Sequence, residues 1–421
     1  MRLLLYGLNY APELTGIGKY TGELAEWLAA QGHAVRVVTA PPYYPAWRVG
    51  AGFQAWAYAR ERRAGVAVWR APLWVPRAPS GLTRVLHLAS FALSSFPLLL
   101  AQLPWRPQVV WVVAPAFTCV PGALVLARLA GAKSWLHIQD FEVDAAFQLG
   151  LLKGRRLRAW ATRLESWLLR RFDRVSSLTG AMLARAAAKG VAKERLVLFP
   201  NWVDTEHIRP LDGPNAYRRA LGIPDDVVVA LYSGNMGAKQ GLELLAEAAR
   251  RLAGEANLRF VFCGDGCGRR DLEAQCAGLA QVTFLDLQPA ERLPELLAMA
   301  DLHLLPQRED ASDLVMPSKL LGMLASGRPV VATALPGSEV AAALEGSGLV
   351  VAPGSMQEWT EAIRRLAQST ELRQALGARG REQAVQSFSI GPLLARFQAA
   401  LDPSTTASPV IGSAQVRHVP K

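Results

Sequence analysis

Cysteine is scarce in this sequence of 421 residues, and its four cysteines exclude a fold built on disulfides. Cys263, Cys267 and Cys276 lack the paired C-x2-C spacing and the histidine partners of a zinc site, so we expect reduced thiols and no bound metal. Disorder is excluded too, because 51% of the residues are hydrophobic and only 19% are charged. The first apolar run, Leu3–Gly7, is too short for a secretory signal, so we expect a cytoplasmic protein.

Acidic residues are scarce in the first half of the chain. Residues 1–205 hold 25 Lys and Arg against 11 Asp and Glu, whereas residues 206–421 hold 21 against 24. This asymmetry indicates a polyanionic partner for the first half only: a phosphorylated substrate, an anionic membrane surface or nucleic acid. Nucleic acid is disfavoured, because the sequence contains no RNA- or DNA-binding module motif.

Short apolar runs alternate with helical segments along almost the whole chain. The expected strands of the first half are Leu3–Leu8, Val35–Thr39, Val109–Ala114, Ser134–Ile138 and Leu196–Phe199. Those of the second half are Val227–Tyr232, Arg259–Cys263, Val282–Leu285, Leu302–Leu305, Val330–Ala332 and Leu349–Val351. Continuous apolar runs between helices are typical of parallel sheets covered on both faces. Two such series predict an α/β protein with two doubly wound, Rossmann-like domains.

The domain boundary is predicted within Pro200–Pro214, where Pro, Asn and Gly cluster. This assigns residues 1–205 to the first domain and residues 206–385 to the second. A helix over 386–402 is predicted to cross back to the first domain. Residues 403–421 are rich in Ser, Thr, Pro and Ala without periodicity, which predicts a disordered tail.

Two segments of the first half suit a membrane surface. Residues 85–104 carry no Asp, Glu, Lys or Arg, but the central Pro97 and several polar residues favour a segment that dips into one leaflet over one that spans the bilayer. Residues 154–174 contain seven Arg, with Trp160, Leu164 and other apolar residues on one helical stripe. The alternatives are a buried core helix for the first segment and a helix packed on its own sheet for the second.

Three glycine-containing or helix-initiating loops are suited to phosphate binding. Asn9–Tyr20 follows the first strand and precedes a helix expected from Glu23, although a simple tight turn is as good an interpretation. Ser233–Gly241 follows the first strand of the second half and contains Lys239, which is either a diphosphate ligand or merely solvated. Asp310–Lys319 places Ser318 and Lys319 at a helix N-terminus.

The sequence resembles glycosyltransferase family 4, and more narrowly its bacterial colanic-acid-biosynthesis branch, over roughly residues 1–400. The resemblance lies in YGLNYAPELTGIGKYTGELAEWLAAQGHAVRVVTAPPYYP (Tyr6–Pro45), HIQDFEVDAA (His137–Ala146), PNWVD (Pro200–Asp204) and VMPSKLLGMLASGRPVVAT (Val315–Thr333). It implies a GT-B fold, in which two Rossmann-like domains face across a cleft. The second domain would hold a nucleotide sugar and the first an acceptor. It also implies a retaining reaction with no catalytic metal and no cofactor.

The resemblance implies roles for particular residues. Those assigned to the donor are Gly16, Gly18, Gly234, Asn235, Lys239, Asp313, Ser318, Lys319 and Glu339, and those assigned to catalysis are His137, Lys239 and Lys319. The family's Glu-x7-Glu motif is absent, because Leu314 and Gly322 occupy its two positions; Asp313 is the expected substitute. Asp140, Glu142 and Asp144 are candidates for acceptor hydroxyl contacts, with salt bridges to the Arg-rich helix as the alternative.

Together these observations predict transfer of a sugar from a nucleotide diphosphate sugar to a polyprenyl-diphosphate-linked saccharide. The resemblance to the branch alone suggests GDP-fucose as the donor, with another GDP- or UDP-sugar as the alternative. The enzyme would work peripherally on the inner face of the cell membrane, in exopolysaccharide biosynthesis. Lysines and helix N-termini would stabilise the charge on the leaving diphosphate. The alternatives are a soluble sugar-nucleotide 2-epimerase on the same fold and, more distantly, a basic nucleic-acid-binding protein.

Overall fold

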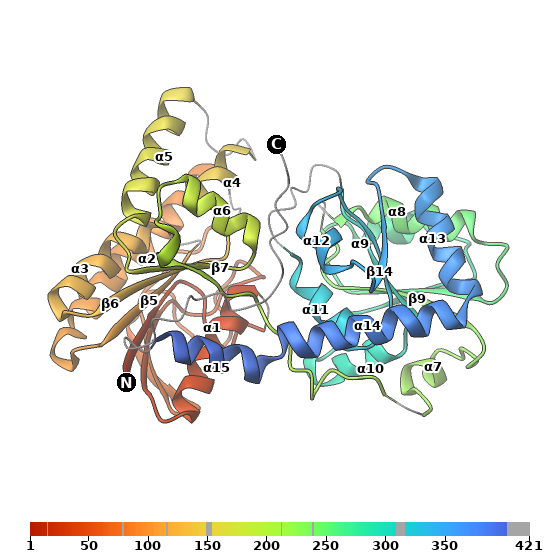
Figure 1. Cartoon of the computed structure of the whole chain (residues 1–421), viewed down its shortest axis with the longest axis horizontal. Coiled ribbons are helices and arrows are strands. Elements are labelled where there is room, and N and C mark those ends of the chain that lie inside the picture. Colours follow the sequence, from red (N-terminus) through yellow and green to blue (C-terminus); the bar gives the residue numbers. More distant parts are fainter. Residues whose placement is uncertain are drawn as a thin grey trace. The chain divides into compact units, whose positions relative to one another are not determined.

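The computed structural model describes residues 1–14, 16–77, 80–114, 117–148, 154–211, 213–237, 240–308 and 316–401. Lys239, Asp313 and the predicted tail 403–421 lie outside this set. The chain forms two compact units. The first unit consists of Met1–Pro200 together with the segment from Leu394 onward, and the second consists of Asn201–Leu393. Each unit is a mainly parallel sheet surrounded by helices (Figure 1), so the predicted α/β class with two Rossmann-like domains is confirmed.

The first unit contains an eight-stranded sheet. Its strands are β1 (Arg2–Tyr6), β2 (Ala34–Thr39), β3 (Ala59–Arg63), β4 (Val66–Arg70), β5 (Val109–Ala114), β6 (Lys133–Ile138), β7 (Arg174–Ser177) and β8 (Leu196–Leu198). The spatial order is β3-β4-β2-β1-β5-β6-β7-β8, and β3 is antiparallel to β4 while the other pairs are parallel. The direction of strand addition reverses between β1 and β5, and ligands of such sheets bind beyond the carboxyl ends of the strands at this point.

Helices cover this sheet on both faces. They are α1 (Gly16–Ala30), α2 (Gly81–Leu100), α3 (Val120–Ala130), α4 (Glu142–Gln148), α5 (Arg155–Leu169), α6 (Gly180–Ala188) and α15 (Ile390–Leu401). From Leu394 onward α15 belongs to this unit, where Phe397 stacks on Phe199 with 4.5 Å between the ring centroids. The segment predicted as one helix over 386–402 instead contains the end of α14 (Thr370–Phe388) and α15, which are separated at Ser389.

The second unit contains a six-stranded, wholly parallel sheet. Its strands are β9 (Val228–Ser233), β10 (Leu258–Cys263), β11 (Val282–Leu285), β12 (Leu302–Leu305), β13 (Val330–Thr333) and β14 (Gly348–Val351). The order β11-β10-β9-β12-β13-β14 is that of a dinucleotide-binding fold, with its switch point between β9 and β12. Both faces are covered by buried apolar side chains, which explains why these strands are continuous apolar runs.

The remaining helices of the second unit connect successive strands or pack on them. They are α7 (Ala216–Ala220), α8 (Leu242–Arg251), α9 (Arg269–Gln275), α10 (Leu293–Ala298), α11 (Ser318–Ala325), α12 (Glu339–Ala343), α13 (Met356–Gln368) and α14. The N-termini of α8 and α11 follow β9 and β12, so both lie at the carboxyl edge of the sheet beside the switch point. This arrangement brings together the two loops that were predicted to bind a phosphate.

Two parts of the sequence interpretation were wrong about local structure. The expected loop Asn9–Tyr20 is shorter, because α1 begins at Gly16 and not near Glu23. Strands β3, β4 and β7 were not predicted. The sequence of β3 is ARERR, which is charged because this strand lies at the edge of the sheet, where it pairs with one neighbour only.

Candidate functional site

The loops that follow β9 and β10 touch through their backbones. The amide of Gly234 donates to the carbonyl of Cys263, and the amide of Met236 donates to that of Asp265. Gly264 has a φ of +146° and lies against Gly234, leaving no space for a side chain. This contact supports the glycine loop beside the N-terminus of α8. The loop from Gly264 to Gly266 thus supports the glycine loop through its backbone.

Lys319 lies at the switch point, in the first turn of α11. Its Nζ donates to Gln240 Oε1 at 3.0 Å and lies 4.4 Å from the centroid of the Tyr232 ring. Its aliphatic chain passes next to Gly234, where a Cβ would lie 3.4 Å from Lys319 Cδ. Burial lowers the pKa of Lys319 to about 7, and no carboxylate among the described residues is paired with it. An ammonium group enclosed without a counter-ion is suited to an anionic ligand.

The other predicted donor residues lie at the same edge of this sheet. Asn235 is exposed directly after Gly234, and Ser318 is exposed as the first residue of α11. Glu339 is half-buried at the start of α12, after β13. The structure thus groups these residues around the loops after β9, β12 and β13. Lys239 and Asp313 lie outside the residues that the structure describes.

Two further contacts fix these loops. Thr333, the last residue of β13, accepts a hydrogen bond from the amide of Gln307 at 2.6 Å and donates to its carbonyl at 2.7 Å. Gly322 stands where the related family carries its second glutamate, and a Cβ there would lie 3.4 Å from Leu297 and 3.7 Å from Ile208. The position is therefore surrounded by apolar side chains.

In the first unit, Glu13 connects two loops at the carboxyl edge of the sheet. Its carboxylate is buried and accepts hydrogen bonds from the amides of Tyr43 and Tyr44, both at 3.0 Å, and from Asn9 Nδ2 at 2.9 Å. Burial raises the pKa of this carboxyl above its usual value. A Cβ at Gly18 would lie 2.5 Å from Glu13 Oε2.

This contact corrects the role predicted for one of the two glycines of that loop. Gly18 is buried against Glu13, so the glycine is needed to accommodate a carboxylate of the protein itself, and we no longer assign it to the donor. Gly16 begins α1 with a φ of +59°. A Cβ built on this residue would lie 3.9 Å from the Tyr44 ring. A side chain would be strained at that φ, which explains the glycine.

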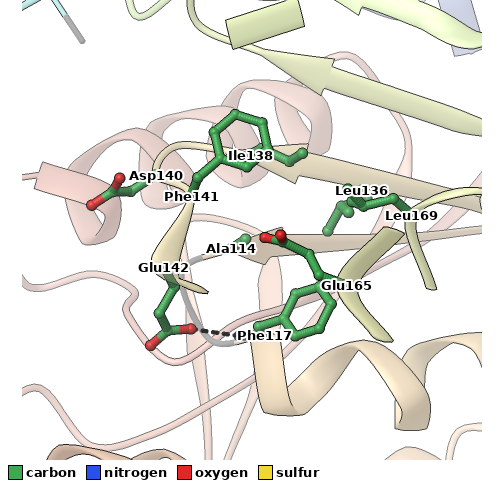
Figure 2. A pocket seen from close by; sticks show the side chains of 9 residues that line it. All are labelled: Ala114, Phe117, Leu136, Ile138, Asp140, Phe141, Glu142, Glu165 and Leu169. Atoms are coloured by element: carbon green, nitrogen blue, oxygen red, sulfur yellow. Dashed lines mark hydrogen bonds between the residues drawn. The ribbon is translucent and has the colours of Figure 1, made fainter. Parts of the chain in front are cut away.

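A small pocket lies beyond the carboxyl ends of β5 and β6. Its volume is about 10 Å³, room for a single water, and it is lined by Ala114, Phe117, Leu136, Ile138, Asp140, Phe141, Glu142, Glu165 and Leu169. Figure 2 shows the carboxyl groups of Asp140 and Glu142 on one side of the pocket and Glu165 on the other. Glu142 accepts a hydrogen bond from the amide of Phe117 at 3.0 Å, and burial raises its pKa to about 7. Glu142 can therefore both donate and accept a hydrogen bond near neutral pH.

Asp144 is instead part of an ion-pair network. It accepts from Arg185 Nε at 2.8 Å and lies 3.0 Å from Lys189 Nζ, and Lys189 also pairs with the buried Glu165. Burial raises the pKa of Asp144, but the two cations outweigh this effect and lower it overall. The alternative interpretation, a salt bridge, is the one that Asp144 follows, but its partners lie on or directly after α6 and not on the Arg-rich helix. We therefore remove Asp144 from the acceptor candidates.

The structure gives no support to a catalytic role for His137. Its ring stacks on Trp111 with 5.2 Å between centroids and meets Phe199 edge-on at 5.4 Å, and its Nδ1 lies 2.9 Å from Ser176 Oγ. Successive strand residues point to opposite faces of a sheet, so His137 faces the aromatic cluster around Phe397 while Ile138 lines the pocket. Burial lowers the pKa of His137 to about 3, which keeps the ring neutral.

Helices α2 and α5 expose many apolar side chains. On α2 these are Leu82, Val85, Leu86, Leu93, Phe96 and Leu100, and on α5 they are Leu157, Trp160, Leu164 and Trp167. Among the described helices, α2 alone is long and apolar enough to cross a membrane by length and composition, with 22% of its apolar window buried. The predicted stripe of the Arg-rich helix is divided, because Leu168 and Phe172 are buried in the unit. The rest of the stripe is exposed in the part of the chain that the structure describes.

Sequence reasoning missed Glu13 and Tyr232. Glu13 is an isolated acid in a loop, and its three hydrogen-bond partners are up to 31 residues away, so no local pattern indicates its role. Tyr232 is the penultimate residue of a strand that reads as apolar throughout, and its contact with Lys319 depends on the pairing of β9 with β12.

Comparison with known proteins agrees with this architecture. Residues 15–202 match the glycosyl transferase 4-like domain, and residues 215–383 match the glycosyl transferases group 1 domain. The chain therefore belongs to the glycosyltransferases, and the expected family and enzyme class are confirmed. A relative from Escherichia coli strain K12, named as a colanic acid biosynthesis glycosyl transferase (WcaI), is 48% identical over 87% of this chain and 92% of its own length.

Solved structures show the same fold. Sucrose-phosphate synthase from Thermosynechococcus elongatus matches with a TM-score of 0.73 at 17% identity, covering 95% of this chain and 98% of that one. Anabaena HepE in complex with UDP-glucose matches with a TM-score of 0.66 at 16% identity, covering 95% and 99%. These likenesses confirm the GT-B class predicted for the two Rossmann-like domains.

Proposed function

We propose that this glycosyltransferase moves a sugar from a nucleotide diphosphate sugar to a polyprenyl-diphosphate-linked saccharide, in the biosynthesis of an exopolysaccharide. The observation that carries the donor half of this proposal is the enclosed ammonium of Lys319. It lies at the switch point of the second unit, beside the glycine loop after β9, and it has no described anionic partner. A diphosphate is the anion that such a site in this fold suits best.

The similar proteins support a nucleotide sugar as the donor. HepE from Anabaena was solved in complex with UDP-glucose, and the E. coli relative is named for colanic acid biosynthesis. A panel of GDP- and UDP-sugars will identify the base and the sugar that this chain uses. GDP-fucose and UDP-glucose are the first donors to compare.

The surface of the first unit supports an acceptor held at a membrane. Exposed leucines and tryptophans of α5 share that helix with Arg155, Arg156 and Arg158, which are also exposed. Apolar side chains insert at the interface of a bilayer, and each nearby arginine adds attraction to anionic lipids. We therefore place the enzyme peripherally on the inner face of the cell membrane. The pocket with Asp140 and Glu142, beyond β5 and β6, would take the acceptor hydroxyls.

The proposed chemistry places the developing negative charge on the leaving diphosphate. Lys319, together with the amides at the start of α11, would stabilise that charge, and Lys239 from the neighbouring loop would add to it. We propose that no metal is required and that the anomeric configuration is retained, as the family resemblance implies. Retention is tested by determining the anomeric configuration of the product by NMR, and metal independence by adding EDTA.

The experiment that tests the function is nucleoside diphosphate release from a panel of GDP- and UDP-sugars, with and without a polyprenyl-diphosphate-linked saccharide. We expect release from one donor that depends on the lipid acceptor. Conversion of a nucleotide sugar without any acceptor would instead identify a 2-epimerase. Binding of nucleotides without release or conversion, across all acceptors tried, would contradict the proposed acceptor class.

A further inference from the structure

Three side chains meet where the loop after β2 contacts the first turns of α2. The Trp47 ring lies 5.4 Å from the His87 ring between centroids, and the Arg84 guanidinium carbon lies 5.7 Å from the centroid of the Trp47 ring. Trp47 has a φ of +50°, a backbone conformation that bulky residues rarely adopt. Such outliers are concentrated at ligand-binding positions, where the surrounding structure holds them in place.

His87 has an unpartnered ring nitrogen within this cluster. The residue is 1% exposed, and its Nδ1 lies 2.7 Å from the carbonyl oxygen of Trp74. Its Nε2 is buried and has no hydrogen-bond partner among the described residues. The other face of the site is closed by Tyr43, whose ring lies 4.8 Å from the His87 ring. Because Nδ1 faces a carbonyl oxygen, it carries the ring proton, and Nε2 is an acceptor that a buried water would satisfy.

Arg84 is the one charged residue of α2. It is exposed, and it forms no ion pair with any carboxylate in the described part of the chain. A guanidinium offers five N–H donors in a planar fork, which matches the oxygens of a phosphate better than an ammonium does.

The neighbours of Arg84 on the same helix place it at the level of the lipid surface. Leu82, Val85 and Leu86 are exposed, apolar and within one turn of it. If this face of α2 meets the membrane, a guanidinium at this position lies at the interface, where the phosphates of lipids are found.

We propose that Arg84, supported by Trp47 and His87, binds the diphosphate of the lipid-linked acceptor. This inference rests on the proposed function, and it assigns the part of the acceptor that the enzyme recognises. Trp47 holds the guanidinium in place by its ring contact, and the His87 ring packs against Trp47 and holds it. The same chemistry would also suit the headgroup of an ordinary anionic phospholipid, and the experiment separates these two sources.

The test compares two acceptors that carry the same saccharide, one on a polyprenyl diphosphate and the other on a polyprenyl monophosphate, in non-ionic detergent micelles. The wild-type enzyme is expected to prefer the diphosphate. Arg84→Gln should lower kcat/KM for the diphosphate acceptor by about 10- to 100-fold, with a much smaller loss for the monophosphate. Arg84→Lys should give an intermediate loss, and the KM for the donor should not change.

The matched control is Arg128→Gln, which removes an exposed arginine from the last turn of α3, a helix that packs on α2. This variant should keep the preference for the diphosphate. An unchanged preference in Arg84→Gln would overturn the inference. If Arg84→Gln keeps the preference but weakens binding to anionic vesicles more than Arg128→Gln does, Arg84 binds phospholipid headgroups instead. A wild-type enzyme that used neither acceptor would refute the proposed function itself, before any variant was compared.

Discussion

Gly264 faces the carbonyl oxygen of Gly234 so closely that a Cβ at position 264 would lie 1.9 Å from that oxygen. The contact joins the loops after β10 and β9 backbone to backbone, and it lies beneath the loop that borders Lys319. The geometry of the proposed donor site therefore depends on a backbone contact between two glycines.

Replacing Gly264 by alanine should damage the second unit and the donor site together. The added methyl group must displace the β9 loop, and φ at this position, +146°, is unfavourable for alanine. We expect a loss of about 2 kcal/mol or more in the free energy of unfolding and at least a tenfold loss in nucleotide affinity. Thermal unfolding and a nucleotide titration measure the two effects. Gly254→Ala is the control, because nothing lies within 4 Å of its Cβ position, and it should be nearly neutral.

Lys319 should make donor binding depend on pH. Burial lowers its pKa to about 7, so above that pH the free enzyme holds a neutral amine. A diphosphate favours the ammonium, so binding above pH 7 takes up a proton and becomes weaker as the pH rises, by at most about tenfold per pH unit.

Calorimetric titrations in two buffers of different ionisation enthalpy report this proton uptake. Lys319→Arg should bind the donor without the uptake, because its side chain stays charged. Lys319→Met should bind weakly at every pH. Equal proton uptake by the wild type and by Lys319→Met would show that another group titrates on binding.

Glu142 should reduce the stability of the protein at high pH. Its folded pKa is raised by burial from 4.5 to about 7, so the native state holds more protons than the unfolded state between these values. Stability contributed by the protonated carboxyl is present below pH 4.5 and is lost as the pH rises through about 7. Glu142→Gln should therefore unfold at a higher temperature than the wild type at pH 8 and at nearly the same temperature at pH 4. An equal difference at both pH values would contradict this assignment.

Reversing the charge of Arg155, Arg156 and Arg158 should release the enzyme from anionic vesicles. Each exposed arginine near such a surface contributes about 1 kcal/mol, so three Glu substitutions should weaken binding by well over a hundredfold. Vesicle co-sedimentation measures this. The control reverses Arg219, Arg270 and Arg365, which are exposed in the second unit, and should leave binding almost unchanged. Equal losses in both variants would indicate a non-specific effect of net charge.

The sequence predicted the bounds of secondary-structure elements well where one kind of residue determines the local structure. Central strands such as β5 and β12 are unbroken apolar runs because both faces of their sheets are covered, and their bounds match the predicted ones. The edge strand β3 is made mostly of charged residues, and β7 has a single apolar residue, Val175, so neither carried a recognisable pattern. The helix start at Gly16 was missed because glycine is a poor helix former and gave no initiating signal.

The candidate site could be predicted only in part. Lys319 and Gly234 stand in loops that follow strands, and the parallel order of the sheet brings such loops together. The orientation of His137 could not be predicted from the sequence. It is determined by the face of β6 on which α15 packs, and this helix lies more than 250 residues further along the chain. The residues that follow the strand, from Gln139 onward, are polar, and they gave no sign of the aromatic packing on this face.

The return of α15 to the first unit has a consequence for protein synthesis. Trp135 and Phe199 pack on Phe397, so their apolar surface lacks its cover until the last helix has left the ribosome. The first unit is thus completed after the second has been made, although it contains the N-terminus. A chain that stopped near Pro200 would present an uncovered aromatic surface to chaperones and to other chains.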